Sequence, residues 1–334
     1  MNVRRWTPLS TISTSTAVAL GVLGFFVPMA MSQNTQQNLT SLLILIILAA
    51  MWNALAGFGG LVSIGQQAFI GLGAYGTVWI VHHGQKPFIA MLYATIACGL
   101  IAIPISFVAL RLRAAQFAIG MWVVAEVFAI LVTLDSSLGA GTGTSLIEFN
   151  YYLPAQRTRY VYWWALAACI VSLTVLFVLL RRPLGSSLQA IRDDEEAAAS
   201  LGVRVTTGKR ILFVLAGLGC GAAGALILAN TLFIEPTSIF SVQWTAYMIF
   251  MVLVGGLGTF EGPIIGAVIL YVIQNQFIDN GNVYLTGLGV TSVLFALLLP
   301  RGLWGTMVDR FGVRLLPVGY RVVSTNEGTG PESG

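Results

Sequence analysis

Long stretches of apolar residues, separated by short loops that hold nearly all of the charge, occupy most of the sequence. A helix that crosses a bilayer needs about 20 mostly apolar residues. Ten stretches come close to that length, so we expect an all-α polytopic membrane protein with about ten transmembrane helices. The ten stretches cover residues 15–32, 39–56, 61–81, 87–110, 114–134, 160–180, 211–231, 242–257, 263–278 and 283–300.

Two of these stretches, 242–257 and 263–278, hold only 16 residues each. At about 1.5 Å per residue, a helix of that length reaches about 24 Å, which is shorter than a hydrocarbon core roughly 30 Å thick. A membrane tolerates a broken or re-entrant helix where protein or water covers its backbone groups. The sequence leaves open whether these two stretches cross fully.

The composition agrees with a membrane-embedded chain. Hydrophobic residues make up 57% of the sequence and charged residues only 9%, whereas a soluble domain carries roughly 25% charged residues. This deficit excludes an ordinary cytosolic enzyme, a nucleic-acid-binding protein and a disordered linker.

The distribution of basic residues predicts how the bundle is oriented. With the N-terminus in the cytoplasm, ten crossings leave only Lys86, Arg157 and Arg159 outside. The other 14 of the 17 basic residues then fall inside, and both termini are cytoplasmic. These 14 are Arg4, Arg5, Arg111, Arg113, Arg181, Arg182, Arg192, Arg204, Lys209, Arg210, Arg301, Arg310, Arg314 and Arg321.

We expect a single domain. A cytoplasmic N-terminus (1–14) leads into one transmembrane domain (15–315), which contains one sizeable cytoplasmic loop (181–210). The cytoplasmic tail (316–334) is expected to be disordered, because its end is rich in Gly, Pro, Ser and Glu. A signal peptide is the alternative for the first stretch, but Met29–Ser32 lacks a clean small-x-small cleavage site and favours a retained helix.

Residues suited to catalysis or metal binding are scarce. Cys98, Cys169 and Cys220 lie far apart inside apolar stretches, which indicates packing rather than metal ligands or disulfides. The adjacent His82 and His83 lie in a predicted outside loop, as expected for solvated side chains. No GxSxG or HExxH motif is present. We therefore expect no enzyme activity and no metal site.

The run from Gly202 to Arg210 resembles a phosphate-binding loop but does not match its motif. Five residues rather than four separate Gly202 from Gly208, and Arg210 follows Lys209 where a Ser or Thr is required. We therefore expect this chain to bind no nucleotide or other cofactor of its own.

Small residues recur at helical spacing and predict a tightly packed bundle. Gly217 and Gly221 form a GxxxG motif, which Gly224 and Ala225 extend. Helices in lipid associate through close backbone approach, so small residues mark helix interfaces. The further glycines of this kind are Gly65, Gly71, Gly73, Gly76, Gly258, Gly262 and Gly266.

Glu126 is the one ionisable residue deep inside a predicted span. It follows Ala114 by 12 residues, which places it about 18 Å along a helix and near the middle of the bilayer. An intramembrane charge is costly and by default a functional candidate. Two interpretations stay open: Glu126 faces a water-filled path, or it is a neutral carboxyl group that holds helices together.

The loop 181–210 predicts a short amphipathic helix on the cytoplasmic side. Pro183 ends the preceding helix, Ser187 can cap a new one, and Gly202 can stop it. Arg192 and Glu196 have the spacing of an i,i+4 ion pair. This helix is either an idle surface element or a segment that docks into a groove on another protein. Its apolar face consists of Leu188, Ile191, Ala198 and Leu201.

This loop resembles the coupling segment of ATP-binding cassette (ABC) importer permeases, whose pattern runs roughly G-x-x-x-x-A-I-R-x-[DE]-E-x-A-A-x-x-[LM]-G. More narrowly, the chain is similar to the branched-chain amino acid permeases of the LivM type. Gly59–Tyr75, Gly139–Leu146 and Gly255–Pro263 resemble three glycine-rich segments of that family, and Glu126 falls where the family commonly has an acidic residue. The residues that match the coupling pattern are Gly185, Ala190, Ile191, Arg192, Asp194, Glu195, Ala197, Ala198, Leu201 and Gly202.

The sequence departs from the family pattern at two places. Gln66 stands where the family usually has His, and the Gly/Thr-rich turn from Gly139 to Leu146 lacks the usual Asn or Asp. Both departures leave the identity of the transported solute undecided. Branched-chain amino acids, other amino acids, amides and urea-like compounds therefore stay open.

The resemblance implies a BtuC- and LivM-like permease bundle in the cytoplasmic membrane of a prokaryote. A second, LivH-like permease subunit would complete the path, two ABC ATPase subunits would bind and hydrolyse ATP, and an extracytoplasmic binding protein would deliver the solute. The implied translocation path includes Gln66, Gln67, Tyr75, Glu126 and Thr142. The implied ATPase-coupling residues are Gly185, Ser186, Ser187, Leu188, Gln189, Ala190, Ile191, Arg192, Asp193, Asp194, Glu195, Glu196, Ala197, Ala198, Ala199, Ser200, Leu201 and Gly202.

An ion-gradient-driven secondary transporter is the main alternative. Such a protein usually has intramembrane acidic or basic residues for ion coupling, often in both halves of an inverted repeat. Glu126 has no counterpart in the second half of this sequence, which argues against that alternative.

Overall fold

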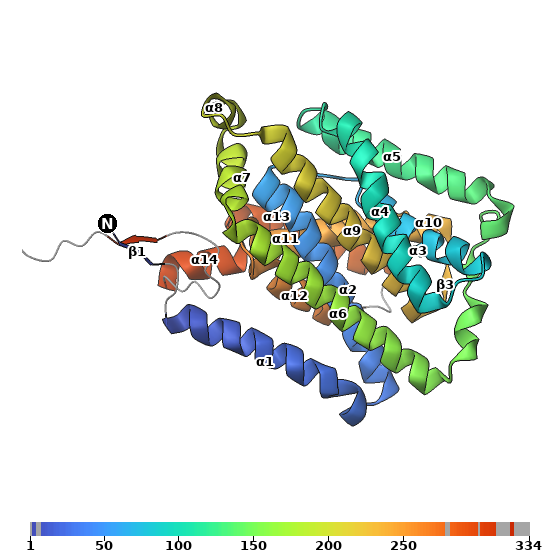
Figure 1. Cartoon of the computed structure of the whole chain (residues 1–334). Helices are drawn as coiled ribbons and strands as arrows, with labels where there is room; N and C mark the ends of the chain where they lie inside the picture. The colour runs from blue at the N-terminus through green and yellow to red at the C-terminus, as the bar shows by residue number, and fades with distance from the viewer. Residues whose placement is uncertain (1, 5–7, 278–280, 300, 312–320, 324–334) are drawn as a thin grey trace, which may run out of the picture.

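The computed structural model describes residues 2–4, 8–277, 281–299, 301–311 and 321–323, most of which lie in helices packed into one bundle (Figure 1). Two antiparallel strand pairs complete it: β1 (Asn2–Arg4) with β4 (Arg321–Val323), and β2 (Thr144–Ser145) with β3 (Phe233–Ile234). The α-helices are α1 (Pro8–Ala30), α2 (Gln33–Asn53), α3 (Gln67–His82), α4 (Pro87–Ala109), α5 (Ala115–Leu134), α6 (Pro154–Arg181), α7 (Pro183–Asp193), α8 (Glu195–Ser200), α9 (Val205–Thr231), α10 (Pro236–Ile239), α11 (Gln243–Gly255), α12 (Gly262–Phe277), α13 (Gly281–Leu298) and α14 (Gly302–Phe311).

Three short irregular helices connect these elements. A π-helical turn, η1 (Ala54–Phe58), continues α2, and the 3-10 turns η2 (Ser136–Leu138) and η3 (Ile147–Tyr151) lie between α5 and α6.

The structure is mostly helical, as predicted, and contains helices suited to span a membrane. Within the part of the chain that the structure describes, seven helical segments are long and apolar enough to cross a membrane. The number of ten crossings stays a prediction, although a helix lies in each of the ten predicted ranges. The seven segments are Gln33–Phe58, Pro87–Ala109, Ala115–Leu134, Pro154–Arg181, Val205–Thr231, Pro236–Gly255 and Thr286–Val308.

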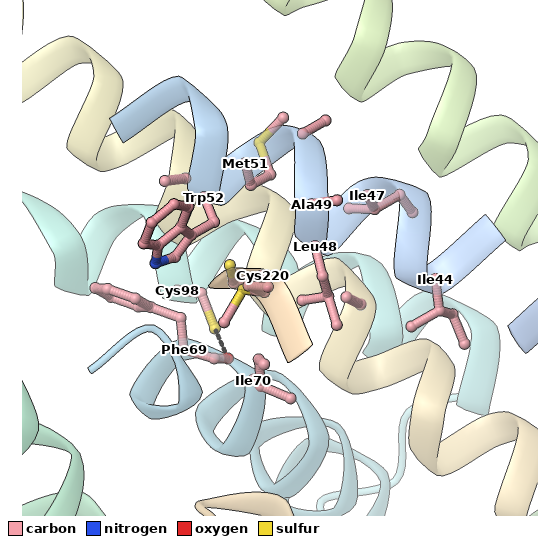
Figure 2. Packing of buried hydrophobic residues seen from close by; sticks show 14 of the residues in the cluster. Ile44, Ile47, Leu48, Ala49, Met51, Trp52, Phe69, Ile70, Cys98 and Cys220 are labelled. Carbon is pink, nitrogen blue, oxygen red and sulfur yellow. Dashed lines mark hydrogen bonds between the residues drawn. The ribbon is translucent and has the colours of Figure 1, made fainter. Parts of the chain in front are cut away.

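The core of the bundle lies around α2, α3 and α9. Figure 2 shows Met51 of α2, Phe69 of α3 and Cys220 of α9 packed together, all of them buried. The thiol of Cys98 on α4 donates a hydrogen bond to the carbonyl oxygen of Phe69 (3.7 Å). Cys98, Cys169 and Cys220 are all buried. By contrast, only a minority of the residues of α4, α5 and α6 are buried and many of their large apolar side chains are exposed, as expected of helices that face lipid or a partner.

Glycines allow α3 to approach its neighbours at backbone distance. A Cβ atom on Gly73 would collide with the backbone of Gly221 on α9, and one on Gly224 would collide with the carbonyl group of Ile70. Gly65, just before α3, lies equally close to the carbonyl group of Met121 on α5. The predicted role of the small residues in close crossings is confirmed at these positions.

One predicted helix begins later than expected. The stretch 61–81 was predicted to be helical throughout, but α3 begins only at Gln67, and residues 60–66 form an irregular, partly buried segment. Gly60 adopts a positive φ of 66°, which helical residues do not have. Trp52 Nε1 donates to the carbonyl oxygen of Ser63 (2.9 Å), so protein groups satisfy this buried backbone.

Helix ends meet in two groups at opposite ends of the bundle (Figure 1). At one end, Arg192 of α7 bonds to Gly57 of η1, and the start of α14 lies against the backbone of Gly256. At the other end, β2 pairs with β3, and Phe88 of α4 packs against Tyr152, with ring centroids 5.4 Å apart. The long helices therefore run back and forth between two faces.

Candidate functional site

The loop that resembles a coupling segment folds as two helices rather than the single one expected. The first helix, α7, begins at Pro183, so Ser187 is no N-cap and its hydroxyl donates to the carbonyl oxygen of Pro183 (3.1 Å). The chain becomes extended at Asp194 (φ −156°, ψ 110°) and starts α8 there. The Asp194 carboxylate accepts hydrogen bonds from the N–H groups of Glu196 (3.0 Å) and Ala197 (2.9 Å), a typical N-cap.

The break at Asp194 explains two further corrections. Arg192 and Glu196 no longer share a helix, so the predicted i,i+4 pair is absent, and Arg192 Nη1 donates instead to the carbonyl oxygen of Gly57 (2.9 Å). Leu201 was expected on the apolar face but is 83% exposed, because the break turns α8 away from the line of α7. Gly202 ends the segment with a positive φ of 82°, as predicted.

One face of the α7–α8 pair is seated firmly on the bundle. Leu188, Ile191 and Ala198 are buried, as the periodicity predicted. Gly208 on α9 leaves room for Leu188 and Ile191, whose nearest atoms would be 3.3 Å from a Cβ atom placed there.

The opposite face of the pair is exposed and acidic. Asp193, Asp194 and Glu196 are exposed, and Glu195 pairs with Lys209 of α9 (Nζ–Oε2 2.5 Å). An exposed helix pair that presents small residues and carboxylates can dock into a groove on another protein. Its position at one end of the bundle is visible at the upper left of Figure 1.

Glu126 lies on the outer side of α5 and is exposed. Its Oε1 accepts a hydrogen bond from Trp122 Nε1 of the same helix (3.2 Å). The carboxyl group thus bonds along its own helix rather than to a neighbouring one, which does not favour the interpretation that it holds the helices of this chain together. The exposed apolar residues on this side of α5 are Ile119, Trp122, Val123, Val127, Ile130, Leu131 and Leu134.

The other proposed path residues do not gather around Glu126. Gln66, Gln67 and Tyr75 are buried inside the bundle, whereas Thr142 is exposed in the loop after η2. Their role in a path stays a prediction.

Each buried member of this set bonds within the chain. Gln67 Oε1 accepts from the hydroxyl of Thr245 (2.6 Å), and Gln66 Nε2 donates to the Ser63 hydroxyl (3.3 Å). Gln66 Oε1 is buried with no hydrogen-bond partner among the described residues. The Tyr75 hydroxyl donates to the carbonyl oxygen of Ile234 (3.4 Å).

A cavity that the sequence did not predict opens at the end of the bundle where β2 pairs with β3. Its volume is about 380 Å³, and Glu235 is the one charged residue in its lining. The only signal in the sequence was the Glu235–Pro236 step that starts α10, which is too common to mark a site. The lining residues are Ile227, Thr231, Phe233, Ile234, Glu235, Ser238, Ile239 and Trp244. Among the described residues, no three His, Cys, Asp or Glu side chains group as metal ligands do.

Comparison with known proteins assigns the chain to a family. Residues 34–299 match the family model of the permease component of branched-chain amino acid transport systems. The high-affinity branched-chain amino acid permease LivM of Escherichia coli K12 is 31% identical over 317 residues, covering 86% of this chain and 73% of the relative. The LivM protein of Salmonella typhimurium is 30% identical with the same coverage.

Two further proteins show more limited similarity to the chain. The ribose import permease RbsC of Bacillus subtilis is 32% identical over 111 residues, covering 32% of this chain and 34% of the relative. A solved inward-facing metal-chelate type ABC transporter covers 91% of this chain and 99% of its own, with 17% identity and a TM-score of 0.47.

Proposed function

The chain belongs to the family of branched-chain amino acid transport permeases, and from this premise we propose that it is the permease subunit of an ABC importer for branched-chain or chemically related amino acids. The observation that carries the proposal is the family match over residues 34–299, to which the seated, outward-facing α7–α8 pair adds a docking element. ATP would be bound and hydrolysed by separate subunits, and this chain would bind no nucleotide.

We propose that Gly185–Gly202 dock with an ATPase subunit. The arrangement of the segment supports this role, since its apolar side is buried against α9 and its acidic side is exposed. A moving partner would push on a short, capped helix pair rather than on a flexible loop.

We propose that the outer side of α5 faces a second permease subunit and the solute path between the two subunits. A carboxylate turned toward lipid is costly, and Glu126 is exposed in the middle of a span whose other exposed residues are apolar. Contact with a partner or with water would remove that cost. An extracytoplasmic binding protein would deliver the solute at the end where β2 pairs with β3.

We propose ten crossings of a prokaryotic cytoplasmic membrane with both termini in the cytoplasm. The sorting of helix ends into two groups supports this topology, because α7, η1 and α14 share one end while the β2–β3 pair lies at the other. The described part of 15–315 would then form one transmembrane domain, flanked by the segments 1–14 and 316–334.

The test is uptake of labelled leucine into vesicles that carry the chain with candidate partner subunits. We expect uptake that requires ATP, survives collapse of the ion gradient and is inhibited by isoleucine and valine. Uptake that ignores ATP and stops when the gradient collapses would instead establish the secondary transporter. Inhibition by other amino acids, amides or urea alone would assign a different solute to the same importer.

A further inference from the structure

Three segments far apart in the sequence meet where the α7–α8 pair joins the bundle. They are the π-turn η1 at the end of α2, the end of α7, and the turn between α11 and α12. The contacts are made by five residues, which we call the Arg192 junction: Asn53, Gly57, Arg192, Gly258 and Thr259.

Arg192 links α7 to the π-turn. Its Nη1 atom donates to the carbonyl oxygen of Gly57 (2.9 Å), and its side chain keeps 42% of its surface exposed. A guanidinium donor makes this a charge-assisted hydrogen bond, which is roughly twice as strong as a neutral one. A π-helical turn frequently lies at a functional site, and here it offers its carbonyl group to the only segment proposed to touch an ATPase.

Asn53 links the same turn to the α11–α12 connection. Its Nδ2 donates to the carbonyl oxygen of Thr259 (2.8 Å), while its Oδ1 accepts from the N–H of Gly258 (2.9 Å). The side chain is only 1% exposed. Both ends of one amide are therefore used to hold a turn that lies more than 200 residues away in the sequence.

The backbones at the junction lie so close together that two of its glycines leave no room for a Cβ atom. A Cβ atom on Gly57 would collide with Asn53 Oδ1 and with the backbone of Gly258. One on Gly258, whose φ is +74°, would collide with the Arg192 guanidinium. Packed interiors have low compressibility and transmit strain, so we expect a shift of α7 to displace η1 and the α11–α12 turn.

We propose that Arg192 and Asn53 are positioning residues that transmit ATPase-driven movement of α7 to α2 and to the α11–α12 hairpin. The inference rests on the proposed docking of Gly185–Gly202 with an ATPase. The inference adds a route for the movement into the bundle. Because α2 is largely buried and packs against α6, α9 and α12, movement of its end would reach the centre of the bundle.

The first test is the ratio of solute transported to ATP hydrolysed in proteoliposomes that hold the whole importer. We expect Arg192→Gln to keep the ATPase subunits attached and hydrolysing ATP, and to lower the ratio about tenfold through loss of the charged donor. Arg192→Lys, which keeps a charged donor, should recover part of the ratio. Arg204→Gln, which removes an exposed cation just after the α7–α8 pair, should leave the ratio unchanged.

The second test asks whether the two links act in series. Asn53→Asp removes the donor to Thr259 and keeps the acceptor for Gly258. If both links serve one route, the double variant should be no worse than the more severe single variant. The proposal would be overturned if the losses of the two single variants in the transport-to-ATP ratio multiplied in the double variant. It would also be overturned if Arg192→Gln kept the wild-type ratio or released the ATPase subunits. Absence of ATP-dependent uptake in the wild type would instead refute the proposed function.

Discussion

Glu126 illustrates how a single residue in a membrane helix constrains its surroundings. It sits among exposed apolar side chains and bonds only along its own helix, through Trp122, within the described structure. A carboxylate in that position is costly in a membrane unless a partner or water covers it.

We expect Glu126→Gln to lower uptake several-fold without loss of assembly, because the variant keeps size and hydrogen bonding but removes the charge. Uptake in vesicles and co-purification of the partner subunits measure the two effects. Glu148→Gln, which neutralises an exposed carboxylate in η3, is the matched control. Full activity of Glu126→Gln would show that the charge has no part in transport.

Asp135 provides a prediction about pH. The Ser137 hydroxyl (2.7 Å) and N–H (2.9 Å) both donate to its carboxylate and lower its pKa. A carboxyl group whose pKa falls on folding stabilises the fold above its unfolded pKa and loses that effect as pH drops through the folded value. We expect the hydrogen-exchange protection factor of the Ser137 amide to stay level down to about pH 4 and to fall below it. Asp135→Asn should abolish this pH dependence.

Individual side chains show where inference from the sequence ends. The burial of Leu188, Ile191 and Ala198 followed from helical periodicity, which depends only on neighbours along the chain. The environment of Gln67 did not, since its partner Thr245 lies 178 residues away. The same holds for Asn53, which in the sequence is merely one polar residue at the end of an apolar stretch.

At the scale of elements, the α7–α8 break matters most. The resemblance to a coupling segment located the loop and its last residue, Gly202, but periodicity alone joined the two helices into one. In an amphipathic sequence pattern, an aspartate can be a surface residue within a helix or the N-cap of a new one. The extended backbone of Asp194 and its hydrogen bond from the N–H of Glu196 show that it is an N-cap.

We expect Asp194→Ala to weaken transport, because loss of an N-cap costs about 1 kcal/mol and lets α8 change its angle to α7. Uptake should fall several-fold while insertion of the chain stays normal. Asp194→Asn should retain most activity, since Asn caps as well as Asp. Equal losses in the two variants would mean that the charge, not the cap, is required.

The late start of α3 has a comparable cause. No charged residue interrupts the sequence from 61 to 81, so the hydropathy pattern could not reveal that residues 60–66 are irregular. The positive φ of Gly60 and the bonds to Ser63 are properties of the packed bundle. Of the glycines predicted to mark close approach in this stretch, Gly65, Gly71 and Gly73 do so, whereas a Cβ atom on Gly76 would meet only ordinary contacts.

For the whole molecule, charge asymmetry and helix-end contacts are independent arguments for one topology. The first counts basic residues in loops, and the second uses packing between distant helices. Both support the proposal that the α7–α8 pair and the β2–β3 pair lie on opposite sides of the membrane.

Reporter fusions can test this topology directly. A cytoplasmically active reporter should work when fused after Arg182 and fail when fused after Gln85, and a reporter active outside should give the reverse. If both fusions reported the same side of the membrane, the ten-crossing topology would be wrong.

The burial of all three cysteines has a practical consequence for spectroscopy. Cys98, Cys169 and Cys220 are at most 4% exposed, so a bulky thiol reagent should leave the folded wild-type chain unlabelled. A cysteine introduced at the exposed Leu201 would then be the main attachment point for a fluorophore. The native chain is thus suited to following α8 optically during turnover, with no need to replace its own cysteines.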